Sequence, residues 1–144
     1  MRILTKFLAP LVLLGLSGCM QHNGDIGDWF GTWKLESIEV NGATDASYAD
    51  NVFFQFQTDV VRMVAVLPYQ AYSDRFGSWE QDGNTLILNY SYTAAGTQQI
   101  HNPLPQTYLD KAANILQISE MTSRRMTWRY EKPDSVIVYT LRKQ

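Results

Sequence analysis

The chain has 144 residues, 45% of them hydrophobic, with 12 basic and 14 acidic side chains and a formal net charge of −2. A chain of this length forms one domain that can bury a sizeable core, and its single cysteine excludes an intrachain disulfide. The small acidic excess argues against nucleic acid or an anionic membrane surface as a partner, because both select for clustered lysine and arginine. Composition therefore favours a single domain that its own core stabilises.

The first 18 residues have the pattern of an export signal. Arg2 and Lys6 form a basic start, and an apolar run follows at residues 7–16. The run is too short for a comfortable membrane span and lies where the apolar region of a signal peptide lies. These residues are therefore expected to be removed rather than to join the fold.

The apolar run is followed by a motif that resembles the lipobox of bacterial lipoproteins, Leu16-Ser17-Gly18-Cys19. The resemblance implies that the signal peptide, residues 1–18, is cut before Cys19. The cysteine thiol then receives a diacylglycerol, and the new amino group receives an acyl chain such as palmitate. A dual-acyl anchor is stable, since each buried methylene contributes roughly 0.8 kcal/mol. The alternative is an ordinary secretory signal with an incidental cysteine.

The residues after the lipobox indicate location and domain boundaries. Met20 rather than aspartate follows the cysteine, which by resemblance to Gram-negative sorting signals favours the outer membrane, on its periplasmic face or at the cell surface. Loss of residues 1–18 removes two basic side chains and leaves 126 residues with 10 basic and 14 acidic ones, a charge of −4. Polar residues 19–28 are expected to form a lipidated tether, and residues 29–144 to form one folded domain.

From Trp29 onward the sequence alternates between apolar and polar residues with a period of two, which is typical of half-buried β-strands. Enrichment in β-branched and aromatic residues supports the same assignment. A parity slip near Ser37 indicates a bulge in the first strand. Eight strands are predicted in this way, at residues 32–40, 52–56, 60–67, 76–81, 85–92, 115–121, 124–131 and 136–143.

The connections between these strands alternate between long and tight. Long connections follow the first, third and fifth strands, and tight ones follow the second, fourth and sixth. Loops alternate between the two ends of an up-and-down sheet, so this pattern predicts an all-β, eight-stranded antiparallel up-and-down barrel with one end closed. The long connections, residues 41–51, 68–75 and 93–113, frame the open mouth, and the last of them can fold over it as a lid.

The start of the first strand carries Gly31-Thr32-Trp33, which resembles the G-x-W signature of lipocalins and of bacterial lipocalin-like lipoproteins. The D-G-N hairpin at residues 82–84 and a last strand that ends in Tyr139-Thr140-Leu141-Arg142 are similar too. The resemblance covers residues 26–144 and implies a lipocalin-like barrel. The chain is shorter than typical lipocalins, lacks their usual disulfide and shows no clear helix after the last strand.

The tryptophan of this signature lies at the closed end of the barrel in lipocalins, which makes Trp33 the expected plug. The first and last strands of a closed barrel pair, so the start of the first strand lies beside the end of the last. A cation from the last strand is therefore expected over the indole, a contact worth roughly 0.5–2 kcal/mol. The family motif favours Arg142 there, and strand parity favours Lys143. A covering turn is expected at Ile26, Trp29 and Phe30.

The sequence offers no constellation for catalysis, a metal ion or a cofactor. His22 and His101 have no ligand spacing to a cysteine, histidine or glutamate, and no serine-hydrolase, phosphate-loop or zinc-protease motif occurs. The outward strand positions include Lys34, Arg62 and Arg129, which excludes a barrel with lipid-facing strands. The chain is therefore expected to bind a partner rather than to catalyse a reaction.

Bulky side chains are expected to face the barrel interior, and two interpretations of them stay open. Aromatic rings, a flexible methionine and tyrosine hydroxyls suit a pocket for a small apolar or amphipathic ligand. An eight-stranded barrel is also just wide enough for side chains alone to fill, which favours a protein-interaction or inhibitor module that uses the mouth loops. The predicted ligand-binding residues are Phe54, Met63, Trp79, Leu88, Tyr90, Trp128, Tyr130 and Tyr139.

Overall fold

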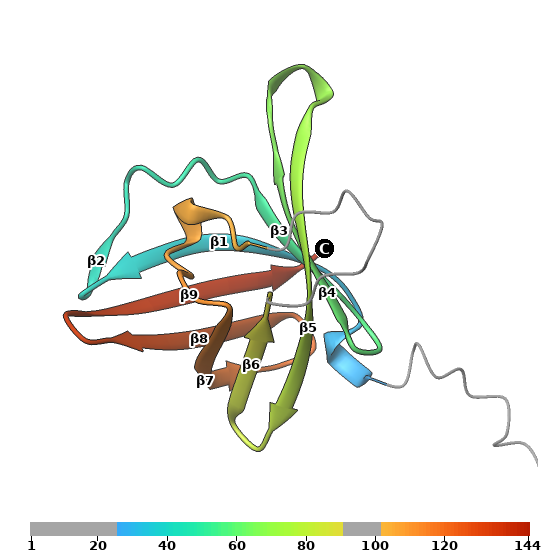
Figure 1. Cartoon of the computed structure of the whole chain (residues 1–144), viewed down its shortest axis with the longest axis vertical. Coiled ribbons are helices and arrows are strands. Elements are labelled where there is room, and N and C mark those ends of the chain that lie inside the picture. The colour runs from blue at the N-terminus through green and yellow to red at the C-terminus, as the bar shows by residue number, and fades with distance from the viewer. Residues whose placement is uncertain (1–25, 91–101) are drawn as a thin grey trace, which may run out of the picture.

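The computed structural model describes residues 26–90 and 102–144, and this part of the chain is almost entirely β-sheet (Figure 1). The predicted signal peptide, Cys19, both histidines and most of the predicted tether lie outside the described residues. The elements are η3 (Gly27–Trp29), β1 (Gly31–Val40), β2 (Ala43–Thr44), β3 (Val52–Gln57), β4 (Val60–Val66), η4 (Pro68–Gln70), β5 (Tyr72–Asp82), β6 (Thr85–Asn89), η5 (Pro105–Thr107), β7 (Ala113–Met121), β8 (Arg125–Lys132) and β9 (Ser135–Lys143).

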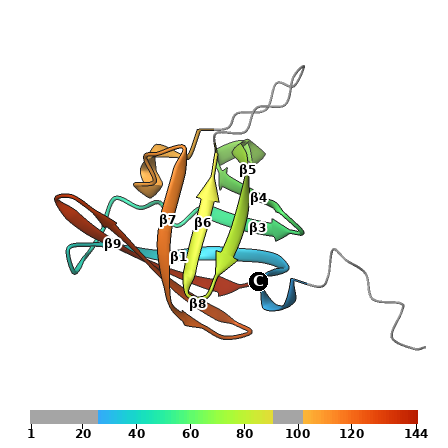
Figure 2. The same cartoon turned by 60° about the horizontal axis from the view of Figure 1, so that its bottom comes forward.

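Eight of the described strands close into an antiparallel barrel, which confirms the predicted fold class. The order runs β1-β3-β4-β5-β6-β7-β8-β9, and β9 pairs with β1 to complete the ring, while the short β2 extends the edge of β1. The tight turns after β3, β5 and β7 gather at one end, together with η3 and the C-terminus (Figure 2). We call this the closed end, and the opposite end, where β6 stops and β7 starts, the mouth.

The pairing of β1 with β9 explains the parity slip seen in the first strand. The register shifts between Leu35 and Ser37, which confirms the predicted bulge. Trp33, Leu35 and Ile38 are all fully buried, and the three-residue step from Leu35 to Ile38 requires one extra residue in the strand. The bulge therefore lets all three side chains face the interior and the strand still pair along its length with β9.

Alternation along the other strands places their apolar residues inside. In β8, Met126, Trp128 and Tyr130 are buried, whereas Arg125 and Arg129 between them are exposed. The same two-residue period holds in β6, where Leu86 and Leu88 have no exposed surface. One cluster of buried side chains therefore fills the barrel, with residues from β1, β3, β4, β6, β7, β8 and β9, and the partly buried Trp79 of β5 packs against it.

The β4–β5 hairpin is longer than the sequence predicts. Val66 pairs with Tyr72, so β5 begins four residues before the predicted start at Phe76, and the predicted long loop at residues 68–75 is wrong. The actual connection is the single turn η4, in which Tyr69 has a left-handed backbone with φ of 62°. The resulting hairpin stands out beyond the rest of the barrel at the mouth (Figure 1).

The fifth predicted strand can be followed only in part. It begins at Thr85 as predicted, and β6 ends at Asn89, while residues 91 and 92 lie outside the described residues.

None of the helical turns within residues 26–90 and 102–144 has the length and hydropathy of a membrane span.

Candidate functional site

The closed end of the barrel is sealed by an indole under a backbone turn. Trp33 has no exposed surface, and its Nε1 donates a hydrogen bond to the carbonyl oxygen of Trp29 at 3.2 Å. The ammonium of Lys143 lies 4.8 Å from the centroid of the Trp33 ring. The same ammonium donates to the carbonyl oxygens of Asp28 and Phe30, each at 2.6 Å. Lys143 therefore joins the turn, the plug and the last strand at one point.

Arg142 is not part of the plug, and its prediction from the family motif is wrong. Trp33 and Lys143 are register partners, so alternation directs Arg142 to the outer surface, where its Nε lies 3.0 Å from Glu36 Oε2. The prediction from strand parity, which favours Lys143, is therefore confirmed. Gly31 is favoured here by its backbone, because its φ of 116° is one that L side chains rarely adopt, whereas a Cβ would make only an ordinary contact with Lys143 Cε at 3.5 Å.

Trp79, predicted as a ligand-binding residue, belongs to an aromatic cluster at the closed end. Its ring centroid lies 4.8 Å from that of Trp29 and 5.2 Å from that of Phe56. Trp29 Nε1 donates to Gln81 Oε1 at 2.9 Å, which fixes the covering turn against β5. The position of Trp79, three residues before the tight turn at residues 82–84, already implies a place near that end.

The middle of the barrel is filled by side chains that the sequence predicted to line a pocket. Phe54, Met63, Leu88, Trp128 and Tyr139 face inward as predicted, and each has no exposed surface. The ring of Phe54 meets that of Trp128 edge-on at 5.1 Å, and Trp128 lies 6.1 Å from Tyr139. All five belong to one cluster of buried side chains, so within the described residues they form a packed core, as an eight-stranded barrel permits. The predicted pocket among them is not open.

The mouth is covered by residues 102–112, the last part of the connection that the sequence predicts as a lid. The carbonyl oxygen of Thr107 accepts a hydrogen bond from the Tyr139 hydroxyl at 2.5 Å, and the Leu104 amide lies 3.4 Å from Met63 Sδ. We call residues 102–112 the lid segment. Its buried side chains are Leu104, Thr107 and Leu109.

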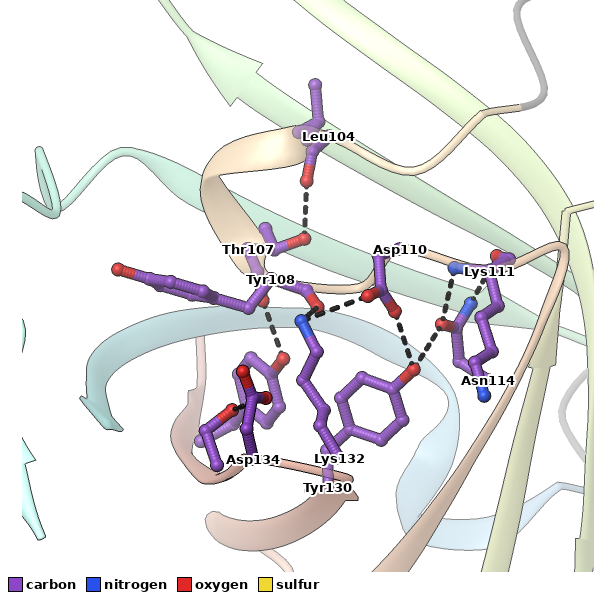
Figure 3. Close-up of polar contacts among 11 residues, drawn as sticks. Leu104, Thr107, Tyr108, Asp110, Lys111, Asn114, Tyr130, Lys132 and Asp134 are labelled. Carbon is purple, nitrogen blue, oxygen red and sulfur yellow. Dashed lines mark hydrogen bonds and ion pairs between the residues drawn. The ribbon is translucent and has the colours of Figure 1, made fainter. Parts of the chain in front are cut away.

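Polar side chains fasten the lid segment to the ends of β7 and β8 (Figure 3). The Tyr130 hydroxyl donates to Asp110 Oδ1 at 2.8 Å and lies 3.1 Å from Asn114 Oδ1. Lys132 Nζ lies 3.0 Å from Asp110 Oδ2 and donates to the carbonyl oxygen of Tyr108 at 3.3 Å. The hydrogen bond from Lys132 and then that from Tyr130 lower the pKa of Asp110. Burial, followed by the hydrogen bond to Asp110, raises the pKa of Tyr130.

A second tie joins the lid segment to the connection after β1. The Tyr108 hydroxyl donates to Asp45 Oδ2 at 2.8 Å, and the Ser47 hydroxyl donates to Asp45 Oδ1 at 2.6 Å. These bonds, that from Ser47 first, lower the pKa of Asp45. Tyr48 holds this connection in place, since its hydroxyl donates to the Leu35 carbonyl oxygen at 2.5 Å. Burial raises the pKa of Tyr48 to about 12, so its hydroxyl stays a donor.

Beside the lid segment lies a hollow of about 530 Å³. Tyr90, the residue after β6, lines it, is 2% exposed, and carries a buried hydroxyl that has no hydrogen-bond partner among the described residues. Burial raises the pKa of this hydroxyl, so it stays protonated. The hollow is lined by Tyr90, Asn102, Pro103, Pro105, Tyr108, Leu109, Asp110, Lys111, Ala112 and Lys132.

The predicted site residues are thus divided among three places. Five fill the core, Trp79 lies at the closed end, and Tyr90 and Tyr130 reach the mouth. The mouth also uses groups that sequence reasoning missed, because polar residues in loops and at the ends of strands carry no periodic signal. Those groups are Asp45, Thr107, Asp110, Asn114 and Lys132. Within the described residues, no three His, Cys, Asp or Glu side chains converge on a metal position.

An eight-stranded up-and-down barrel with an indole at one end and a loop across the other is the architecture of small barrel proteins that enclose ligands. A family model described as a lipocalin-like domain matches residues 14–139. The chain therefore belongs to this lipocalin-like family.

Solved structures share the fold at low sequence identity. An uncharacterized protein from Bacteroides eggerthii DSM 20697 matches with a TM-score of 0.62 and 18% identity, over 81% of this chain and 99% of that one. A lipocalin-like protein from Bacteroides uniformis ATCC 8492 matches with a TM-score of 0.53 and 18% identity, over 82% of this chain and 100% of that one. A search of curated proteins found no match.

Proposed function

We propose that this chain is a lipid-anchored protein of the bacterial cell envelope that binds a small amphipathic molecule at the mouth of its barrel. The lipobox resemblance at Leu16–Cys19 supports the anchor, and Met20 supports the outer membrane. The lipocalin-like fold supports ligand binding. The role is binding without catalysis, in line with the sequence, which offers no set of catalytic residues.

The hollow beside the lid segment is the observation that carries this proposal. Its volume of about 530 Å³ lies within the range of roughly 300–1,000 Å³ that is usual for small-molecule sites. Pro103, Pro105 and Leu109 supply apolar surface, and Lys111 and the ion pair of Lys132 with Asp110 supply polar surface. A surface of this mixed kind suits a molecule with an apolar part and a polar head.

The site differs from the one that the sequence predicts. The barrel interior is occupied by its own side chains, so the ligand lies between the lid segment and the strand ends instead of along the axis. Affinity comes from burial of apolar ligand surface, at roughly 25 cal/mol per Å².

The described part of the chain begins at the closed end of the barrel, opposite to the proposed site. Ile26, the first described residue, precedes η3 at the closed end, and the lid segment lies at the mouth. A tether of about nine residues reaches roughly 30 Å when extended. The mouth therefore faces away from the membrane on average, toward soluble ligands.

A protein-interaction or inhibitor module is the second candidate, and one observation favours it. The β4–β5 hairpin carries Tyr69, which is fully exposed, and Tyr72, which is 62% exposed. Exposed tyrosines beside an apolar residue such as Leu67 are common in protein interfaces. On this alternative the hairpin makes the contact and the hollow has no ligand.

A fluorescent amphiphile tests the leading proposal. We expect 8-anilinonaphthalene-1-sulfonate to bind the purified lipoprotein in neutral nanodiscs, beyond the signal of empty nanodiscs. Ala112→Trp should weaken this binding about tenfold or more, because Ala112 lines the hollow. Ala113→Trp is the matched control, since Ala113 is the next residue and does not line it. Equal affinity in both variants, or a signal no greater than that of empty nanodiscs, contradicts binding in the hollow.

Native mass spectrometry gives an independent measurement. Protein purified from its own host should carry a non-covalent small molecule that dissociates on activation and is reduced by Ala112→Trp. A preparation that carries none, and that instead co-purifies with a protein whose binding depends on Tyr69, favours the interaction module.

A further inference from the structure

Exposed apolar side chains are concentrated on one wall of the barrel. Across residues 26–90 and 102–144, seven large apolar or aromatic side chains are exposed, and four of them lie within residues 66–72 of the β4–β5 hairpin. Two more, Phe30 and Val60, lie at the closed end of this wall, where both line one hollow. Ile115 of β7 is the seventh and lies elsewhere. A contiguous exposed apolar surface usually marks a contact with a protein or a membrane.

The two groups are joined along the outer face of β3, β4 and β5. Even-numbered residues of β4 face outward, since the odd-numbered ones at 61, 63 and 65 are buried in the core. Two hollows on this outer face, one toward each end of the wall, share Thr32, Gln55 and Arg62, so the surface between them is continuous. We call this surface the outer stripe. Its apolar side chains are those of Phe30, Phe53, Val60, Val66, Tyr72 and Phe76.

Charge on the outer stripe is balanced. Of the described residues that line either hollow, only Arg62 is charged, and its Nη2 lies 2.9 Å from Asp74 Oδ2. The same guanidinium lies 5.6 Å from the centroid of the Tyr72 ring and 6.0 Å from that of Phe76, so it packs on aromatic surface. No charged residue occurs between Arg62 and Asp74 in the sequence. The stripe therefore suits a zwitterionic surface and offers no attraction to a strongly charged one.

The tip of the hairpin presents a tyrosine on a strained backbone. Tyr69 and Gln70 are both left-handed, with φ of 62° and 63°, in a turn where glycine or asparagine is usual. Tyr69 is fully exposed, so its ring makes no contribution to the core that would offset the strain. Backbone strain of this kind is concentrated at functional positions. Tyrosine is enriched at membrane–water interfaces, because its ring is apolar and its hydroxyl is polar.

On the proposed function, a bilayer lies close to one end of this wall. Phe30 lies four residues after Ile26, and Cys19 lies seven residues before Ile26. Seven residues span at most about 25 Å when extended, so an anchor at Cys19 keeps the lipid surface within that distance of Ile26. A short tether gives an effective concentration of roughly millimolar, so weak apolar contacts suffice for docking.

We infer that the outer stripe lies against the surface of the zwitterionic phospholipid bilayer that holds the anchor, as a second contact with the membrane. The inference rests on the lipid anchor of the proposed function and adds an orientation of the barrel. The tether alone leaves the mouth facing away from the membrane on average. Contact along the stripe, from Phe30 at the closed end to Tyr72 in the projecting hairpin, turns the barrel onto its side (Figure 1).

Fluorescence quenching by labelled lipids tests this inference. Cys19 is the only cysteine and carries lipid on the proposed function, so a nitrobenzoxadiazole dye attaches only at a cysteine introduced elsewhere. Gln70→Cys places the dye on the hairpin, and Gln117→Cys places it at an exposed glutamine of β7, away from the stripe. In phosphatidylcholine vesicles, nitroxide-labelled phosphatidylcholine should quench the dye at residue 70 about threefold more than the dye at residue 117, because docked apolar side chains enter the acyl boundary.

A second pair of variants separates the stripe from the tether. Val66→Glu puts a charge in the stripe, and Ile115→Glu puts the same charge at an exposed position of β7. Both side chains are exposed, so neither replacement enters the core. With the dye at residue 70, Val66→Glu should reduce the quenching to the level found at residue 117, whereas Ile115→Glu should leave it unchanged. Quenching that survives Val66→Glu would show that the stripe does not make the contact, and would overturn the inference.

The remaining outcomes separate this inference from the proposed function. If the lipoprotein floats with the vesicles but the two dyes are quenched equally, the anchor stands and the contact along the stripe is wrong. Equal quenching together with a protein that co-purifies through Tyr69 would assign the stripe to a protein partner instead. If lipoprotein prepared from bacterial membranes does not float with the vesicles, the anchor of the proposed function fails, and this inference fails with it.

Discussion

Lys143 Nζ lies 4.8 Å from the centre of the Trp33 ring and also donates hydrogen bonds to the carbonyl oxygens of Asp28 and Phe30. One ammonium thus joins the first strand, the last strand and the turn that covers the closed end. The arrangement explains why the chain before β1 is part of the fold, since Trp29 in the same turn accepts a hydrogen bond from Trp33 and packs on Trp79.

Replacement of Lys143 should therefore cost more stability than replacement of its neighbour. Lys143→Met keeps an apolar stem of similar length but removes two charge-assisted hydrogen bonds and the cation–π contact, so we expect a loss of about 1–3 kcal/mol. Arg142→Met removes one exposed ion pair with Glu36 and should cost about 0–1 kcal/mol. Urea unfolding followed by tryptophan fluorescence measures both values. Equal losses would contradict the assignment of Lys143 as the capping residue.

Gly77 should tolerate no side chain. A Cβ at this position would lie 2.5 Å from the carbonyl oxygen of Asn89 and 2.9 Å from the ring of Tyr90. A backbone oxygen in a paired strand cannot move without separating β5 from β6. Gly77→Ala is therefore expected to destabilise the protein by about 1–3 kcal/mol. Ser78→Ala, one residue further along β5, should stay within about 0.5 kcal/mol in the same unfolding experiment, and a neutral Gly77→Ala would contradict the described packing.

The sequence predicts most of the barrel because alternation in its strands is strong. In β8 the buried residues Met126, Trp128 and Tyr130 are large, and each residue between them is charged or polar, so the face assignment of this stretch is unambiguous. The bulge near Ser37 could also be predicted, because a change in the alternation of apolar and polar residues within one strand is explained simply by one extra residue in that strand. The closed end follows from loop lengths together with Trp33.

The mouth could not be predicted in the same way. The first part of β5 is polar on both faces, at Ser73, Asp74 and Arg75, so it shows no alternation of apolar and polar residues. Its pairing with β4, which the sequence does not reveal, sets where the strand starts. The hydrogen bond from the Tyr139 hydroxyl to the Thr107 carbonyl oxygen joins residues that are 32 positions apart in the sequence. A tyrosine hydroxyl can bond to many kinds of group, so the sequence does not indicate this partner. Whether the barrel was hollow depended on how its side chains fill a fixed volume, which composition alone leaves open.

Acid should loosen the lid segment. The pKa values of Asp45 and Asp110 are both below the ordinary value of 3.8, owing mainly to Ser47 for the former and to Lys132 for the latter. A carboxyl with a lowered folded-state pKa stabilises the fold fully above its unfolded pKa and loses that contribution as the pH falls through the folded value. The ties should therefore hold above about pH 4 and weaken steadily below it.

The amide resonances of Thr107 and Tyr108 report this change, because both amides are bonded within the lid segment. We expect their chemical shifts to titrate below pH 4 in the wild-type protein. A variant with both Asp45→Asn and Asp110→Asn should show no such titration. Asp134→Asn, in the β8–β9 turn, is the control and should leave the titration as in wild type. A titration that survives in the double variant would show that other groups hold the lid segment at acid pH.

The bond from Tyr139 to Thr107 should be the strongest single tie of the lid segment. Tyr139 is fully buried, and its hydroxyl meets the Thr107 carbonyl oxygen beneath the segment. Tyr139→Phe leaves that carbonyl buried without its donor, so we expect a loss of about 1–3 kcal/mol and faster amide exchange at Thr107. Tyr72→Phe removes a hydroxyl from a residue that is 62% exposed and should change neither quantity measurably. If Tyr139→Phe lowered global stability but left exchange at Thr107 unchanged, the hydroxyl would support the barrel core and not the lid segment.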